Sequence, residues 1–93
     1  MTMIVHRVKC WPTMFDAVRR GEKPFEVRLN DRCYQKGDVL ELHRLLADRH
    51  DAEEDPTARP LRRRITFVLP GGQFGVLPTH CVLGLQETGE RMD

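Results

Sequence analysis

Short runs in which apolar and polar residues alternate fill much of the chain and predict β-strands. Five segments have this pattern or a β-branched, apolar character, and glycine, proline or polar residues bound them: residues 3–10, 25–29, 39–43, 62–69 and 80–85. Side chains two residues apart share one face of a strand, so the apolar positions predict a common core. We expect this core to contain Phe25, Val27, Leu40, Leu42, Ile65, Phe67, Leu83 and Leu85.

One short helix is predicted between the first two of these strands. Pro12 suits a first helical turn, and Gly21 suits the position just after a helix ends. Arg19 and Arg20 suit the negative end of the helix dipole. A helix followed by short strands predicts a mainly β (α+β) fold, a small curled β-barrel of five or six strands with one helix after the first strand.

Composition indicates a single folded domain, which we expect to span residues 1–87, with residues 88–93 as a tail. The chain has 93 residues, of which 40% are hydrophobic and 31% charged. A net charge of +1 excludes a strongly basic nucleic-acid coat, so any polyanion must be bound by a local cluster. No apolar run approaches the roughly 20 residues that span a bilayer. Three cysteines without a CxxC spacing favour a reducing cytoplasm.

The segment 45–60 differs in charge from the rest of the chain. It holds five acidic and two basic residues, whereas residues 1–44 hold nine basic and six acidic ones. Prolines and the loss of apolar periodicity predict a solvated, acidic loop inserted between two strands.

A row of polar residues follows the predicted helix and is the main candidate for a site. Glu26 and Arg28 share the polar face of the strand 25–29, and Asn30 extends that face. Lys23 lies just before this strand, and Lys9 lies on the preceding one. Such a row can present cations to phosphate and polar groups to base edges. Taken from spacing alone, a surface ion pair between Glu26 and Arg28 explains the pattern as well.

Other chemistries have weaker support in the sequence. His80 and Cys81 are adjacent, so on a strand they point to opposite faces and cannot act together as base and nucleophile. The glycines of residues 71–75 lack a following Lys-Ser/Thr, which favours a hairpin turn over a phosphate-binding loop. No closely spaced pair of ligands supports a metal site, and neither a metal nor a cofactor is predicted.

A series of motifs along the chain is distinctive in its order. The motifs are His6-Arg7-Val8-Lys9, Pro12, Phe15, Gly21-Glu22-Lys23, Phe25-Glu26-Val27-Arg28, Asn30-Asp31-Arg32, Tyr34, Gly37-Asp38, Leu40, Leu42, Phe67-Val68-Leu69 and Gly71-Gly72-Gln73-Phe74-Gly75. This series resembles the DUF3850 group, a branch of the ASCH domains in the PUA-like superfamily, over the whole chain except the acidic segment and the tail. Before Arg59 the group usually has a Tyr-Thr-Gly-Arg-like turn, and this chain has Ala58 in place of its glycine.

The resemblance implies a PUA-like barrel whose cleft binds RNA or a nucleotide-like ligand. The residues that would line this cleft are Lys9, Lys23, Glu26, Arg28, Asn30 and Arg32. Trp11 and Tyr34 are candidates for stacking on a base, or for packing.

Two alternatives remain open at this level. Some ASCH relatives are small amidohydrolases and others are proposed nucleases, which would make Lys23 a base and Glu26 its acid/base partner. A hydroxyl nucleophile would then have to come from Thr66 or Thr79, because position 26 holds a glutamate. The second alternative is a module that binds a protein with an acidic surface, although no motif specifies this partner.

Overall fold

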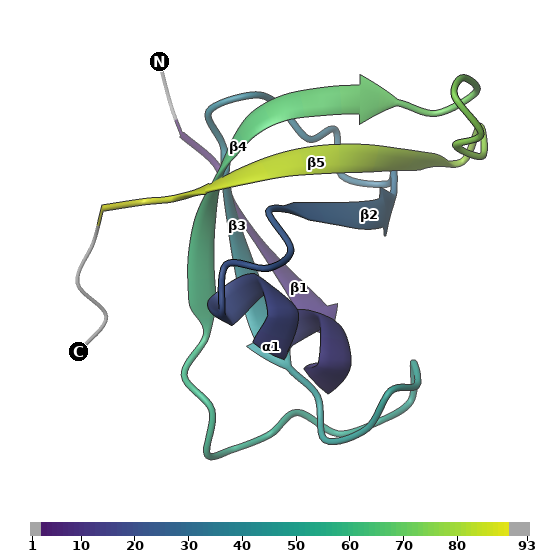
Figure 1. Cartoon of the computed structure of the whole chain (residues 1–93). Helices are drawn as coiled ribbons and strands as arrows, with labels where there is room; N and C mark the ends of the chain where they lie inside the picture. Colours follow the sequence, from purple (N-terminus) through teal and green to yellow (C-terminus); the bar gives the residue numbers. More distant parts are fainter. Residues whose placement is uncertain (1–2, 90–93) are drawn as a thin grey trace.

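Five strands and one helix, arranged along the chain as predicted, make up the protein in a computed structural model that describes residues 3–89 (Figure 1). The elements are β1 (Val5–Cys10), α1 (Pro12–Arg19), β2 (Phe25–Leu29), β3 (Val39–Arg44), β4 (Leu61–Pro70) and β5 (His80–Glu87). The predicted mainly β fold with one short helix after the first strand is confirmed. Of the predicted tail, residues 90–93 lie outside the described part of the chain.

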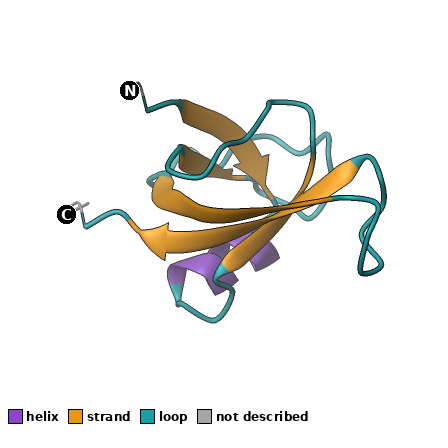
Figure 2. Cartoon of the chain, turned by 90° about the horizontal axis from the view of Figure 1, so that it is seen from above, coloured by secondary structure: helices purple, strands orange, loops and turns teal. Residues whose placement is uncertain are grey.

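The strands form one sheet in the order β1-β3-β4-β5-β2, which curls into a half-barrel (Figure 2). β1 runs parallel to β3, and every other neighbouring pair is antiparallel. β4 bends strongly (Figure 1), and its residues 61–64 pair with β3 while its residues 63–70 pair with β5. The curl brings the two edge strands, β1 and β2, toward each other above α1.

The helix α1 begins and ends as the sequence predicts. Pro12 occupies the first turn, and Arg19 lies in the last. Gly21 adopts a φ of 80°, a left-handed conformation that costs glycine little, and its amide donates to the Val18 carbonyl at 3.0 Å. Phe15 and Val18 are buried against the sheet.

The core lies inside the curl of the sheet and confirms part of the predicted set. Its members come from β1, α1, β3, β4 and β5 and from Tyr34 between strands. Of the eight predicted residues, five are buried: Leu40, Leu42, Ile65, Leu83 and Leu85. Three predictions are wrong, since Phe25, Val27 and Phe67 are 41%, 53% and 61% exposed.

A β-bulge explains the exposure of Phe67. Ile65 pairs with Leu85 and Phe67 with Gly84, so two steps along β4 correspond to one step along β5. The extra residue, Thr66, shifts the alternation by one position and turns Phe67 outward.

The exposure of Phe25 and Val27 has a different cause. β2 alternates as predicted, but Glu26 pairs with the buried Leu83 and therefore shares its inner face. Phe25 and Val27 consequently occupy the outer face of the sheet. The polar row of β2, not its apolar row, faces the interior.

The acidic segment 45–60 is a loop that is anchored to the domain. Leu45, Ala52 and Asp55 are buried, which a freely solvated insert would not require. Arg44 donates to Asp55 at 2.9 Å, and the amide of Thr13 in α1 donates to a carboxylate oxygen of Asp48 at 3.2 Å. The loop therefore packs beneath α1 (Figure 1).

Candidate functional site

Two arginines bridge the seam between the edge strands β1 and β2. Arg28 of β2 donates from Nη1 to the Lys9 carbonyl at 3.0 Å. Arg32, which follows β2, donates from Nη1 to the Arg7 carbonyl at 2.9 Å. Side chains thus satisfy carbonyls on the free edge of β1 that no neighbouring strand reaches.

A groove of about 450 Å³ lies along this seam. We call it the seam groove, and its lining residues are Arg7, Val8, Lys9, Arg28, Arg32, His43 and Glu54. Four of these side chains are permanently cationic at neutral pH and one is acidic. Among the lining residues cations therefore outnumber carboxylates by four to one, although the net charge of the protein is only +1.

A buried carboxylate lies behind Arg28 on the inner face of β2. Glu26 is 3% exposed and contacts the ammonium group of Lys23. Its other carboxylate oxygen lies 3.3 Å from Nη1 of Arg28, and Lys23 also donates to the Phe25 carbonyl at 2.8 Å. Two cations hold the Glu26 charge, which makes its burial tolerable and orients Arg28 toward the seam.

The opposite side of the seam groove contains a second charge network. Both ring nitrogens of His43 contact carboxylates, Glu41 at 2.8 Å and Glu54 at 3.0 Å. Arg62 donates to Glu41 at 2.9 Å, and Arg7 lies 3.4 Å from the same carboxylate. Burial opposes the charged form of His43, but its hydrogen bonds to Glu54 and Glu41 outweigh this cost and raise the pKa of the imidazole. Burial likewise opposes the Glu41 charge, yet its hydrogen bonds from His43 and Arg62 lower the pKa of that carboxyl.

The structure brings most of the predicted site residues together in two layers. Lys9, Arg28 and Arg32 line the seam groove, while Lys23 and Glu26 form the layer behind Arg28. Asn30 is exposed, and its backbone N–H donates to the Thr79 carbonyl at 2.9 Å, so it belongs to the strand end and not to the groove lining.

Sequence reasoning missed four residues of the seam groove: Val8, which is apolar, and the ionisable Arg7, His43 and Glu54. Arg7 carries a detectable signal, because it lies two residues before Lys9 and shares a face of β1 with it. His43 and Glu54 carry none, because the first depends on the pairing of Lys9 with His43 and the second on the fold of the acidic loop.

Three further side chains whose chemistry could suit a nucleophile, a base or a metal ligand have structural roles: Cys10, Cys81 and His80. Burial raises the pKa of the Cys10 thiol to about 12, aided by nearby Glu26, and it also raises the pKa of Cys81. His80 contacts the Thr79 hydroxyl at 2.8 Å. Over residues 3–89, no three His, Cys, Asp or Glu side chains are grouped as metal ligands would be.

The two aromatic candidates for base stacking both pack against histidines. Tyr34 is 5% exposed, and its ring meets His6 edge-on with centroids 4.8 Å apart. Trp11 packs against His50 of the acidic loop with centroids 5.7 Å apart. Tyr34 is therefore a core residue, whereas Trp11 remains 37% exposed at the end of β1.

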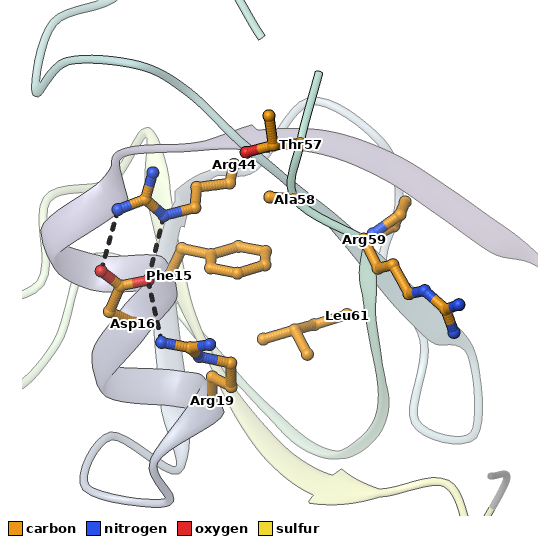
Figure 3. A pocket seen from close by; sticks show the side chains of 9 residues that line it. Phe15, Asp16, Arg19, Arg44, Thr57, Ala58, Arg59 and Leu61 are labelled. Atoms are coloured by element: carbon orange, nitrogen blue, oxygen red, sulfur yellow. Dashed lines mark hydrogen bonds and ion pairs between the residues drawn. The ribbon is translucent and has the colours of Figure 1, made fainter. Parts of the chain in front are cut away.

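A second hollow, of about 430 Å³, lies between α1 and the end of the acidic loop (Figure 3). Arg44 donates two hydrogen bonds of 3.0 Å to Asp16 and one of 2.9 Å to Asp55. The Arg44 hydrogen bonds lower the pKa of Asp16. Carboxylates on two sides already pair with this guanidinium, and these contacts join α1 to the acidic loop. The seam groove is therefore the better candidate site.

The described residues contain one helix, and α1 falls short of the length and apolar character needed to cross a membrane.

Comparison with known proteins identifies a family and one relative. A family model described as "Domain of unknown function (DUF3850)" matches residues 5–85. An "Uncharacterized 12.9 kDa protein in GpA 3'region" of Escherichia phage P2 is 46% identical over 39 residues. This alignment covers 42% of the chain and 36% of the phage protein.

Proposed function

The chain belongs to the DUF3850 family, and we propose that it binds RNA or a nucleotide-like ligand in the seam groove. The observation that carries this proposal is the convergence of Arg7, Lys9, Arg28 and Arg32 on one groove. These side chains come from β1, from β2 and from the segment after β2, and only the curl of the sheet brings them together.

The way in which the arginines are held supports recognition of phosphate. A guanidinium has five N–H donors, and the hydrogen bonds of Arg28 and Arg32 to β1 and to Glu26 use only some of them. Anchoring reduces the conformational entropy that these long side chains lose when a ligand binds. Planar guanidinium groups also match phosphate oxygens in pairs, which favours a phosphate-bearing ligand.

The size of the groove and its neighbours also fit a nucleotide unit. Its volume of about 450 Å³ lies within the range of roughly 300–1,000 Å³ for small-ligand sites. Trp11 lies two residues after Lys9, which lines the groove, and its ring is 37% exposed, so it is a candidate for stacking on a base. The relationship to ASCH and PUA-like domains is part of this proposal, and the half-barrel with its helix after β1 supports it.

Hydrolysis by Lys23 and Glu26 has less support. Lys23 contacts Glu26 and donates to the Phe25 carbonyl, so its ammonium group is held as an ion-pair partner. The Thr79 hydroxyl contacts His80, and the Thr66 hydroxyl lies toward Gly84, so both hydroxyls have neighbours other than Lys23.

The test is a binding measurement with labelled RNA of about 12 nucleotides and, separately, with nucleoside monophosphates. We expect the RNA affinity to fall about tenfold in Arg32→Ala, because a charge-assisted contact is lost. Arg28→Lys should bind RNA more weakly than the wild type, since an ammonium group lacks the planar fork. The matched control is Arg49→Ala, which removes an exposed arginine from the acidic loop and should bind RNA like the wild type.

Each outcome of this measurement bears on a different part of the proposal. Absence of binding to both ligand types at low salt would refute the function. Binding that Arg32→Ala and Arg28→Lys leave unchanged would place the site elsewhere. Product analysis of any bound ligand would detect turnover. Turnover that is lost in Lys23→Ala would support hydrolysis as the function.

A further inference from the structure

The outer face of β2, β5 and β4 is apolar and uncovered. We call it the apolar face, and its residues are Phe25, Val27, Leu29, Phe67, Leu69 and Val82. Phe67 is 61% exposed, and Val27 and Leu29 are each just over half exposed. Large apolar side chains in this number on one side of a sheet are unusual unless another surface covers them.

Strand pairing makes these residues one continuous surface. Val82 of β5 pairs with Val27 on one side and with Leu69 on the other. Two residues farther along β5, Gly84 lies between Phe25 and Phe67 in the same way. Two rows of apolar residues thus cross three strands side by side.

The charge of the apolar face favours a second copy of the chain as its partner. In a two-fold dimer each patch meets itself, so a charged patch would meet its own charge and be repelled. None of the six residues of the apolar face is charged. The ammonium group of Lys23 lies 4.9 Å from the centroid of the Phe25 ring at the border of this face, but it is paired with Glu26. The seam groove, with four cationic side chains, could not pair with itself in this way.

The available area also matches what a dimer requires. At about 150–250 Å² for a phenylalanine and less for valine or leucine, the exposed parts of the apolar face amount to roughly 400 Å². Specific interfaces bury from about 600 Å² per partner upward, so one that is about 65% apolar needs roughly 400 Å² of apolar surface.

From these observations we infer that the protein forms a two-fold homodimer in which the apolar faces of two copies pack against each other. Sheets that pack face to face lie about 10 Å apart with their apolar side chains interleaved, and this surface meets that requirement. The seam groove uses the opposite, inner-facing residues of β2, so the proposed dimer leaves it open in each copy.

The test is the molar mass in solution, measured by sedimentation equilibrium over about 1–100 µM protein. A reducing agent is included because Cys33 is exposed and could link two copies by a disulfide. We expect a dimer of twice 10.8 kDa for the wild type. Val27→Glu should raise the dimer dissociation constant at least about 100-fold, because it would bury a carboxylate without a partner.

Leu46→Glu is the matched control. It introduces the same charge at a leucine that is 55% exposed, but in the acidic loop and outside the apolar face, and it should leave the dimer intact. Phe67→Ser provides a second disruption on a different strand should Val27→Glu fail to fold. A wild type that stays monomeric throughout, or a dimer that survives Val27→Glu and Phe67→Ser, would overturn the inference.

Discussion

The two faces of β2 differ in a way that reverses the usual arrangement of an amphipathic strand. Its inner face carries Glu26 and Arg28, and its outer face carries Phe25, Val27 and Leu29. The inner residues are satisfied by ion pairs and by a backbone carbonyl across the seam. The outer residues remain 41–53% exposed, although the ammonium group of Lys23 lies over the ring of Phe25. An inward polar row can therefore build a site where a barrel closes, provided that each buried charge has a partner.

The largest expected effect is the difference in the free energy of unfolding between a leucine-to-alanine substitution on the inner face and the same substitution on the outer face of the sheet. Leu83→Ala removes a fully buried side chain beside Glu26 and should lower the free energy of unfolding by about 2–5 kcal/mol. Leu29→Ala makes the same change on the outer face and should cost less than about 1 kcal/mol in dilute protein. Urea denaturation measures both, and equal losses would contradict the assignment of the two faces.

The second effect concerns the buried carboxylate of β2. Glu26→Ala would leave Lys23 and Arg28 without their shared partner and should lower the free energy of unfolding by about 2–3 kcal/mol. Its control, Glu22→Ala, removes a well-exposed partner of Arg20 and should leave the denaturation midpoint close to that of the wild type. A stable Glu26→Ala protein would show that the inner polar face does not depend on this pair.

The third prediction concerns the salt dependence of RNA binding. If Arg7, Lys9, Arg28 and Arg32 each contact a phosphate, the logarithm of the RNA affinity should fall against the logarithm of the salt concentration with a slope of about −3. Arg32→Ala should make this slope shallower by about 0.7. Titrations at several salt concentrations measure it, with Arg49→Ala as the unchanged control. A slope near zero would indicate a neutral nucleoside as the ligand.

The smallest expected effect is a dependence on pH through His43. Its pKa is raised above the ordinary value of 6.5, so its charged form stabilises the fold fully below pH 6.5. This contribution disappears as the pH rises through the raised pKa. Protonated His43 also adds a cation to the seam groove, so RNA affinity should decrease over the same pH range. In His43→Gln both changes should vanish, and wild-type profiles identical to those of the variant would contradict this role.

Much of the fold follows from local patterns in the sequence. Pro12 and Gly21 predict the ends of α1 because proline preorganises a first turn and glycine adopts a left-handed φ at low cost. The apolar positions of β5 correctly predict core residues, since that strand keeps a strict alternation over its buried stretch. Leu40 and Leu42 of β3 are also buried as predicted, although β3 is buried on both faces from Val39 to Leu42. The polar row of β2 likewise identifies Arg28 as a residue of the seam groove.

The sequence by itself thus determines the order of the elements, the mainly β class and which side chains of a strand lie together on a face. Only the tertiary structure decides which face of β2 is inside, that the bulge at Thr66 turns Phe67 outward, and that His43 and Glu54 join the seam groove. The physical reason is that alternation shows which side chains of a strand share a face, but not which face is buried. The buried face is set by the pairing with other strands, and the pairing of distant strands depends on contacts that no local pattern contains.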